Sequence, residues 1–279
     1  MKNIVIVPNE SKDIGLAVTK KLIALLIDRA NIHMSKEFSG YGMNVSYHSE
    51  AELYDNADCV IVLGGDGTIL HSAEPCGRKN IPIMGINLGR VGFMTEVNVS
   101  EMEQACSALL DNDYKIEKRM MMRVEVIRDG GKCNEYIALN DAVISKSESP
   151  MILIEVHSDD EKINEYSADG LIISTPTGST GYSLSAGGPV ADPTMELFIA
   201  SPICAHMLHA RPALIPCDKP IELGIDRELG REAVLTVDGN VKEIIGINDK
   251  VVISKSEFYV SIIKLGSQSF YEVLIDKLK

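Results

Sequence analysis

The first 115 residues contain short apolar runs separated by a longer amphipathic stretch. Residues 3–8 are rich in β-branched side chains, and residues 57–63 and 81–86 are almost continuously apolar. Runs of this kind are typical of parallel strands that are covered on both faces. Between the first two runs, five apolar residues recur at helical spacing, which predicts a helix with one buried face: Ile14, Val18, Leu22, Leu25 and Leu26.

Two more helices are predicted after the second and third strands. One is expected from Ile69 onward, and the other ends near Leu110. Ser100 is the expected N-cap of the latter, with Glu103 at the capping-box position. Alternation of strands and helices in this order predicts a doubly wound parallel sheet.

Beyond residue 118 the pattern changes to one that is typical of β structure. Residues 122–128 alternate apolar and charged side chains, and residues 129–131 carry a hairpin turn signal. Helical periodicity is weak here, apart from residues 193–200. Further strand-like runs occupy residues 137–144, 151–157, 170–174, 233–237, 251–253 and 259–264.

We therefore predict an α/β N-terminal doubly wound domain, residues 1–118, and a mostly-β C-terminal domain, residues 119–265. For the tail, residues 266–279, a return to the first domain is left open.

Composition and charge narrow the class of protein. The chain has 279 residues, of which 45% are hydrophobic and 24% charged, as in globular proteins. It contains no apolar run of about 18 residues, and the N-terminal run is too short for a signal peptide, so we expect no membrane association. The net charge of −13 argues against a nucleic-acid partner. A phosphate ligand would need a local pocket of backbone N–H groups, basic residues or a metal ion.

The six cysteines lie at least 13 residues apart, so no CxxC metal or redox pair exists. We interpret them as thiols of a reducing compartment and expect a cytoplasmic protein.

The segment Gly64-Gly65-Asp66-Gly67-Thr68 directly follows a predicted buried strand. Its glycines would allow positive φ angles and close approach to a ligand, and successive N–H groups can form an anion site. The spacing matches neither the Rossmann fingerprint nor the P-loop. Asp66 is the only ionisable group of the segment and could reach a bound hydroxyl or a metal ion. The alternative is a tight turn without a ligand, but ligands commonly bind at this end of a parallel strand.

A second, longer block, residues 167–189, is dense in glycine and small hydroxyl residues. A strand leads into it, and Tyr182 offers an aromatic face on which a base could stack. From composition alone, an ordinary loop of a β domain remains the simpler interpretation.

Together the two blocks resemble the NAD kinase family. GGDGT and DGLIISTPTGSTGYSLSAGGP, residues 169–189, carry the resemblance, and NLGRVGFMT, residues 87–95, is similar to a family segment that ends in GFLT. SPICAH, residues 201–206, with the Arg-Pro pair that follows, also resembles a family segment. Order and spacing agree from about residue 60 to residue 240. GGDGT alone is shared with phosphofructokinases and lipid kinases, whereas the long block is specific.

The resemblance implies transfer of the terminal phosphoryl group of ATP to the 2′-hydroxyl of the adenosine ribose of NAD, giving NADP. It implies that Asp66 is the general base and that Gly67 lies beside it against the dinucleotide. The phosphate loop would consist of Gly64, Gly65, Gly67 and Thr68. The rest of the substrate pocket would be formed by Asn140, Asp141, Asp169, Thr180, Gly181, Tyr182, Ser183, Leu184, Ser185 and Asn240. A divalent cation, Mg²⁺ for preference, would accompany ATP with no ligands assigned on the protein, and the assembly would be a homodimer or homotetramer.

Two alternatives stay open beside the NAD kinase interpretation: a lipid or sugar kinase that shares GGDGT, and a dinucleotide sensor without turnover. The long block argues against the first, and Asp66 argues against the second.

The chain departs from the family pattern at four positions. The departures are Asp141 for Glu, Gly181 for Ala, Ala205 for Pro, and Ser167 where a basic residue is common.

Overall fold

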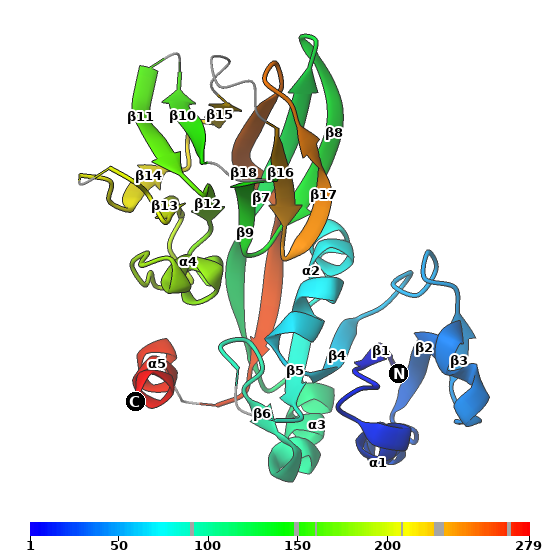
Figure 1. Cartoon of the computed structure of the whole chain (residues 1–279). Helices are drawn as coiled ribbons and strands as arrows, with labels where there is room; N and C mark the ends of the chain where they lie inside the picture. Colours follow the sequence, from blue (N-terminus) through cyan, green and yellow to red (C-terminus); the bar gives the residue numbers. More distant parts are fainter. Residues whose placement is uncertain (90–91, 148–150, 160, 208, 226–231, 267–268) are drawn as a thin grey trace. The chain divides into compact units, whose positions relative to one another are not determined.

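The computed structural model describes residues 1–89, 92–147, 151–159, 161–207, 209–225, 232–266 and 269–279 (Figure 1). The chain forms two compact units. Unit 1 comprises Met1–Lys118 and Tyr259–Lys279, and unit 2 comprises Arg119–Phe258. The chain passes from one unit to the other within β7 (Lys115–Arg128) and again within β18 (Lys250–Lys264), and these two long strands pair with each other.

Unit 1 is built on a parallel sheet. Its strand order is β18-β5-β4-β1-β2-β3, and each neighbouring pair in it runs parallel. Every residue of β4 and β5 is buried, which is why both segments read as continuous apolar runs. The predicted doubly wound α/β fold is thereby confirmed. The bounds are β1 (Lys2–Pro8), β2 (Ala30–Ser35), β3 (Ser46–His48), β4 (Cys59–Gly64) and β5 (Ile83–Asn87), with the short β6 (Val97–Asn98) beside β5.

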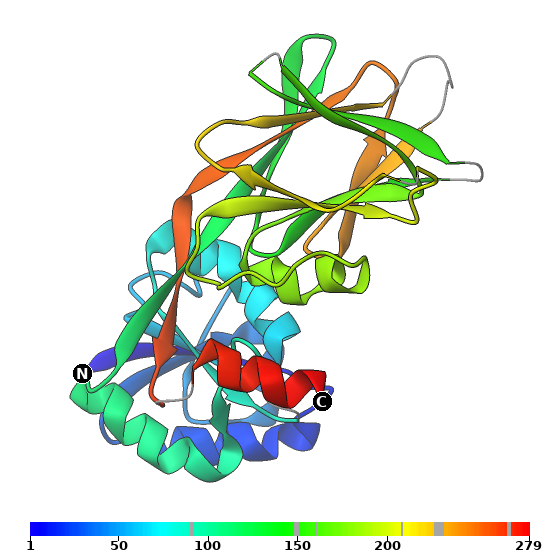
Figure 2. The ribbon, with the colours of Figure 1, turned by 90° about the vertical axis from the view of Figure 1, so that its left-hand side faces the viewer.

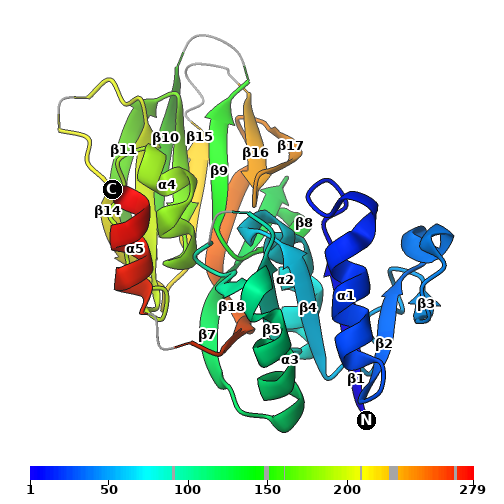
Figure 3. The same cartoon turned by 90° about the horizontal axis from the view of Figure 1, so that it is seen from below.

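Helices cover both faces of this sheet. Figures 2 and 3 show α1 (Ala17–Leu26) and α3 (Met102–Asp111) on one face, where they pack on each other, and Figure 2 shows α2 (Asp66–Lys79) on the other. Alternate residues of the strands face the two helix layers, so Ile61 and Leu63 join the core beneath α1 and α3. Unit 1 also contains short 3₁₀ segments at Ile14–Leu16, Lys36–Tyr41 and Val99–Glu101.

Two predicted helix starts were wrong. The helix after GGDGT begins at Asp66, three residues before Ile69, so the Asp66 carboxylate stands in the first turn where the helix dipole favours negative charge. The capping box near residue 100 is formed by Asn98 and Glu101. The chain enters there through a 3₁₀ turn, which moves the cap two residues upstream of Ser100.

Unit 2 consists mainly of antiparallel strands. One six-stranded sheet has the order β14-β13-β12-β9-β16-β17, and a second group runs β11-β10-β15-β18, with β7 and β8 forming a hairpin beside β18. The hairpin predicted at residues 129–131 is confirmed by the antiparallel pair β7–β8, and β10 also pairs antiparallel with β11. The remaining strand bounds are β8 (Gly131–Ala138), β9 (Asp141–Lys146), β10 (Ile152–Ser158), β11 (Glu161–Ala168), β12 (Gly170–Ser174), β13 (Leu197–Ile203), β14 (Ala213–Pro216), β15 (Ile221–Ile225), β16 (Ala233–Val237) and β17 (Asn240–Ile245).

The helix expected at residues 193–200 was wrong. That segment enters β13, which lies between β12 and β14 and is buried along five consecutive residues. A short apolar run buried on both faces cannot be told from a helix by periodicity. The chain instead turns helical earlier, in η4 (Thr177–Thr180) and α4 (Tyr182–Ser185).

The C-terminal residues form one more helix, α5 (Phe270–Leu278), which belongs to unit 1. Ser269 and Glu272 close a capping box at its start. In the described part of the chain, no helix has the length and apolar character needed to cross a bilayer.

Candidate active site

The Asp66 side chain is held by a turn at residues 92–95 of the same unit. Its Oδ2 accepts a hydrogen bond from the Phe93 N–H at 2.7 Å. Its Oδ1 accepts from the N–H groups of Met94 and Thr95, both at 3.1 Å, and from the Thr95 hydroxyl at 3.2 Å. Four donors therefore fix the orientation of this carboxylate. Sequence reasoning had placed residues 92–95 in a family segment but had given them no role.

Gly92 makes this close approach possible. A Cβ at position 92 would overlap the carboxylate of Asp66 and the hydroxyl of Thr95. Any larger residue would therefore push Asp66 out of the turn.

The glycines around Asp66 act differently from our expectation. Neither Gly64 nor Gly65 adopts the left-handed region, and Gly67 lies inside α2. Instead they allow close packing. A Cβ at Gly64 would overlap the Thr68 side chain, and one at Gly65 would lie 2.9 Å from the Lys12 ammonium. The expected positive φ angles were wrong. Protein side chains lie close to Gly64 and Gly65, and the expected close approach of a ligand stays a prediction.

Lys12 brings a positive charge to the start of α2. It follows β1, and its ammonium lies over the extended backbone of Gly65, the N-cap of that helix. The N-terminus of a helix favours anions, and a lysine beside it strengthens that preference. Nothing in the sequence pattern links Lys12 to a loop some fifty residues later, so sequence reasoning missed it.

In unit 2, Asn140 and Asp141 lie at the turn from β8 to β9, and Asp238 holds this turn from behind. The Asp238 carboxylate accepts from the N–H groups of Leu139 and Asn140 at 2.8 Å each and from that of Asp141 at 3.1 Å. The Asn140 carbonyl in turn accepts from the Thr175 N–H at 2.9 Å. Asp238 was absent from the predicted site, although the Asp-Gly turn ahead of Asn240 is visible in the sequence.

Three buried polar atoms beside this turn have no partner among the described residues: Asn140 Oδ1, Ser174 Oγ and Thr177 Oγ1. Ser174 pairs with Asp141 across the sheet, and Thr177 lies two residues after Thr175. Buried polar groups are normally satisfied, and such orphans commonly mark a ligand or an ordered water.

The carboxyl groups of Asp141 and Asp238 are both buried. Burial, and then the neighbouring charge of Asp238, raises the pKa of Asp141 to about 7. Burial also raises the pKa of Asp238, against the opposing effect of its three N–H donors. Unit 2 thus keeps one carboxyl group close to its titration point at neutral pH.

The loop predicted to wall the pocket forms η4 and α4. Its residues are not equivalent: Ser183 is fully buried and shares a hydrogen bond of 2.8 Å with Ser201, while Tyr182 exposes 50% of its surface. Thr180 donates its hydroxyl to the Thr177 carbonyl. Leu184 and Ser185 belong to α4, with Leu184 partly buried and Ser185 exposed. Tyr182 is therefore the side chain of this loop that is most available to a planar ligand.

Gly178 and Gly181 bring this loop against the Asn140 turn. A Cβ at Gly178 would overlap the Asn140 carbonyl, whereas a Cβ at Gly181 would lie 3.2 Å from the Gly178 carbonyl and 3.8 Å from the Asn140 amide nitrogen. Gly178 is therefore required by the packing, and Gly181 is close to tolerating alanine.

Asp169 forms an ion pair of 2.7 Å with Lys146. Lys146 ends β9 and its N–H donates to the Asp169 carbonyl, so the two residues are direct neighbours. A cation thus stands beside Asp169 even though Ser167 is not basic. Asn240 is exposed and donates its amide to the Asp238 carbonyl at 3.2 Å.

The described residues contain no group of three His, Cys, Asp or Glu side chains that could hold a metal ion.

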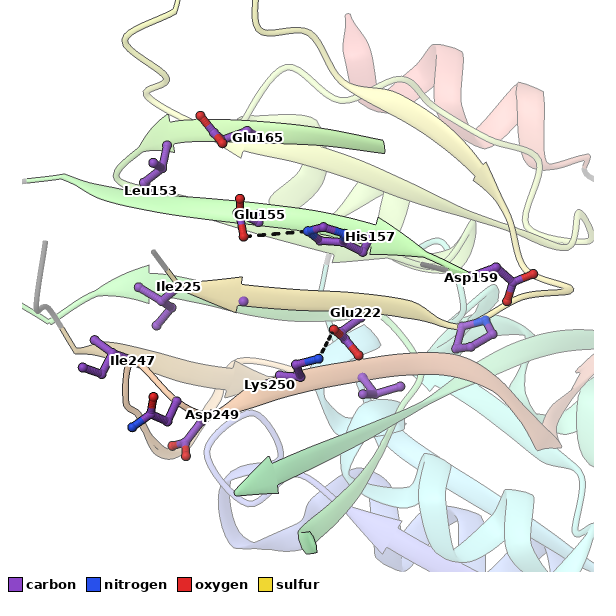
Figure 4. A pocket seen from close by; sticks show the side chains of 14 residues that line it. Leu153, Glu155, His157, Asp159, Glu165, Glu222, Ile225, Ile247, Asp249 and Lys250 are labelled. Atoms are coloured by element: carbon purple, nitrogen blue, oxygen red, sulfur yellow. Dashed lines mark hydrogen bonds and ion pairs between the residues drawn. The ribbon is translucent and has the colours of Figure 1, made fainter. Parts of the chain in front are cut away.

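A large hollow of about 960 Å³ lies elsewhere in unit 2, over β10, β11, β15 and β18 (Figure 4). Five carboxylates line it against one lysine and one histidine: Glu155, Asp159, Glu165, Glu222 and Asp249. All five form ion pairs with residues in or beside the hollow: Glu155 with His157 and Lys162, Asp159 with Lys219, Glu165 with Lys162, Glu222 with Lys250, and Asp249 with Arg128. The lining itself still carries more carboxylates than cations, which disfavours binding of a polyphosphate there.

Comparison with known proteins agrees with the resemblance carried by the motifs. The chain matches the ATP-NAD kinase N-terminal domain over residues 4–114 and the ATP-NAD kinase C-terminal domain over residues 139–265. The chain belongs to the ATP-NAD kinase family. An NAD kinase of Caldanaerobacter subterraneus is 38% identical, with 100% of this chain and 99% of the relative covered. An NAD kinase of Heliobacterium modesticaldum is 44% identical over 80% of this chain and 78% of the relative.

Two solved structures resemble the fold of this family member. An NAD kinase from Archaeoglobus fulgidus in complex with ATP has a TM-score of 0.75 and 25% identity, with 99% of this chain and 98% of that chain covered. A yeast NADH kinase complexed with NADH has a TM-score of 0.90 over 100% of this chain and 87% of that chain. Its identity is 21%, so it supports the fold alone.

Proposed function

We propose that this chain transfers the terminal phosphoryl group of ATP to the 2′-hydroxyl of the adenosine ribose of NAD, with Asp66 as the general base. Family membership makes the chain a phosphotransferase with an alcohol group as acceptor. The observation that carries the assignment of the base is the fixed Asp66 carboxylate at the start of α2, held by four donors. A general base must be oriented within hydrogen-bond reach of the proton that it accepts.

The reaction needs one base and an environment that offsets phosphate charge. Asp66 accepts the proton of the 2′-hydroxyl, the freed oxygen bonds to the γ-phosphorus, and ADP leaves with the electrons of the broken bond. Lys12 and the N-terminus of α2 supply positive charge beside Gly64, Gly65, Gly67 and Thr68, the phosphate loop of the proposal. Phosphoryl transfer depends mainly on such positioning and charge stabilisation, so a weak base suffices.

The dinucleotide pocket of the proposal is formed by the Asn140 turn and the loop of η4 and α4. The three orphaned polar atoms at Asn140, Ser174 and Thr177 support it, because a nucleotide offers amino and hydroxyl donors. Tyr182 supports stacking of a base, and the pair of Asp169 with Lys146 supports a polar contact at the far end of the ligand.

The proposed reaction also uses a divalent cation, for which Mg²⁺ is the first candidate. When bound, it would neutralise charge on the triphosphate. Further parts of the proposal are a cytoplasmic location, supported by six free thiols, and a homodimer or homotetramer, supported by the family resemblance. The net charge of −13 supports the absence of nucleic-acid and anionic-membrane partners.

The acceptor atom provides the test. Purified protein with NAD, ATP and Mg²⁺ should give a single new phosphomonoester, at the adenosine 2′ position, by phosphorus NMR. An NAD analogue that lacks only this hydroxyl should bind competitively and accept no phosphate. Its 3′-hydroxyl lies on the neighbouring carbon, and a misplacement of only about 1 Å can already cost on the order of 10²-fold in rate. Phosphorylation of the analogue, or a 3′ product, would refute the assignment. Binding of NAD without any turnover would favour a dinucleotide sensor.

A further inference from the structure

The two oxygens of the Asp66 carboxylate are used unequally. Oδ1 accepts three hydrogen bonds, from the N–H groups of Met94 and Thr95 and from the Thr95 hydroxyl, whereas Oδ2 accepts one, from Phe93. A carboxylate has about four acceptor sites, two on each oxygen. Counting the described residues alone, Oδ1 therefore has donors for both of its acceptor sites, and Oδ2 has one donor for two sites.

The turn at residues 92–95, which produces this asymmetry, packs against β5 through Thr95. Thr95 is fully buried, and its methyl group packs against Gly85 of β5, where a Cβ would lie 2.9 Å away. The Thr95 hydroxyl is thus held in place to donate to Oδ1. Gly92 leaves the space that Oδ1 occupies. Thr95 and Gly92 thus restrict the position of the Asp66 carboxylate, Thr95 through its packing on β5 and Gly92 by leaving room for Oδ1.

We propose that Thr95 and Gly92 are positioning residues for the base: they hold Oδ1 and leave Oδ2 as the atom that takes the substrate proton. The inference rests on the proposed function, in which Asp66 is the general base. In the reaction, Oδ2 forms a bond to the hydroxyl proton while the hydroxyl oxygen bonds to the γ-phosphorus. The bond from that phosphorus to the β–γ bridging oxygen breaks, and ADP takes the electron pair.

Steady-state kinetics of Thr95→Val and Thr95→Ser test the hydroxyl. Valine keeps the branched shape and removes one donor, so we expect kcat to fall about tenfold or more, as when a group that orients a reacting atom is lost. KM for NAD and for ATP should stay within about twofold, because binding groups are untouched. Serine keeps the donor and should restore most of kcat. A purely structural role of Thr95 would instead lower the amount of folded enzyme and leave kcat per folded molecule unchanged.

Gly92→Ala tests the space, with Gly89→Ala as the matched control. No atom of the described residues lies within 4 Å of a Cβ at Gly89, in the same connection after β5, whereas a Cβ at Gly92 overlaps the Asp66 carboxylate. We expect kcat to fall by about 10²-fold or more in the first variant and to stay near the wild-type value in the second.

The variant Asp66→Asn distinguishes failure of the positioning role from failure of the proposed function. If Asp66→Asn keeps most of its kcat, the base itself is wrongly assigned and the proposed function loses its mechanism. If Asp66→Asn is inactive while Thr95→Val matches the wild type in kcat, the base stands and the positioning role is overturned. Should Thr95→Val fail to fold, equal kcat in Gly92→Ala and Gly89→Ala would overturn it in the same way.

Discussion

At the scale of single residues, Asp141 is a buried carboxyl group beside a second one, Asp238. The NAD kinase pattern carries glutamate at position 141, and this chain carries aspartate. Its carboxyl group is 6% exposed and lies close to the buried Asp238. Both burial and the neighbouring charge disfavour the ionised form, so the pKa of Asp141 rises to about 7.

This raised pKa predicts a pH-dependent stability. A carboxyl group whose folded pKa exceeds its unfolded value binds its proton more tightly in the native state, so its contribution to the free energy of unfolding is fully present below about pH 4. That contribution is lost as the pH rises through about 7. Asp141→Asn removes the dependence, and we expect its melting temperature relative to wild type to be higher at pH 8 than at pH 5.

Thermal melts at the two pH values check this expectation, with Asp113→Asn, a substitution at an exposed aspartate, as the control. A difference between Asp141→Asn and wild type that is the same at both pH values would contradict it.

At the scale of elements, most predicted site residues of unit 2 lie in two connecting segments that pack directly on each other: the turn from β8 to β9 and the loop of η4 and α4. The Asn140 turn is bound from behind by Asp238, and the loop of η4 and α4 packs on it through Gly178. Backbone atoms form most of these contacts, so changes in backbone position should matter more here than changes in side-chain chemistry.

The two glycines of this loop give a paired prediction. Gly178→Ala places a Cβ on the Asn140 carbonyl, which must move. We expect KM for NAD to rise by roughly tenfold or more, and the free energy of unfolding to fall by about 1–3 kcal/mol, as for overpacking elsewhere. In Gly181→Ala the new Cβ would lie 3.2 Å from the Gly178 carbonyl and 3.8 Å from the Asn140 amide nitrogen, which needs only a small adjustment. It should change KM by less than about threefold, in keeping with the alanine of the NAD kinase pattern.

Initial-rate kinetics and denaturant titration of the two variants distinguish these outcomes. If Gly178→Ala binds NAD as well as Gly181→Ala does, the Asn140 turn is not part of the substrate pocket.

At the scale of the whole molecule, the net negative charge of the chain should repel its anionic substrates. The chain carries a net charge of −13, yet ATP and NAD are anions. The described residues offer Lys12 at the start of α2 in unit 1 and Lys146 beside Asp169 in unit 2, but no cluster of three His, Cys, Asp or Glu side chains that would hold a metal ion. A cation that binds together with the triphosphate would offset this negative charge.

We accordingly expect turnover to require a divalent cation bound to ATP. Excess EDTA should abolish NADP formation, and added Mg²⁺ should restore it, because the metal offsets the charge of the transferred group. The measurement is NADP formation with and without EDTA, and NAD binding in EDTA, followed by calorimetry, serves as the control. Undiminished turnover in excess EDTA would contradict this expectation.

The sequence by itself determined three strands of the parallel sheet (β1, β4 and β5), the β7–β8 hairpin of unit 2, the two glycine-rich blocks and, through them, the family. These features depend on residues a few positions apart, so their period and turn chemistry are visible in one dimension. Sequence reasoning missed β2 and β3 of the same sheet. Only the tertiary structure showed that residues 92–95 surround Asp66, that Asp238 supports Asn140, and that Lys146 lies beside Asp169. Each of these contacts joins residues more than twenty positions apart. Strand pairing and packing bring such residues together, and no local pattern records them.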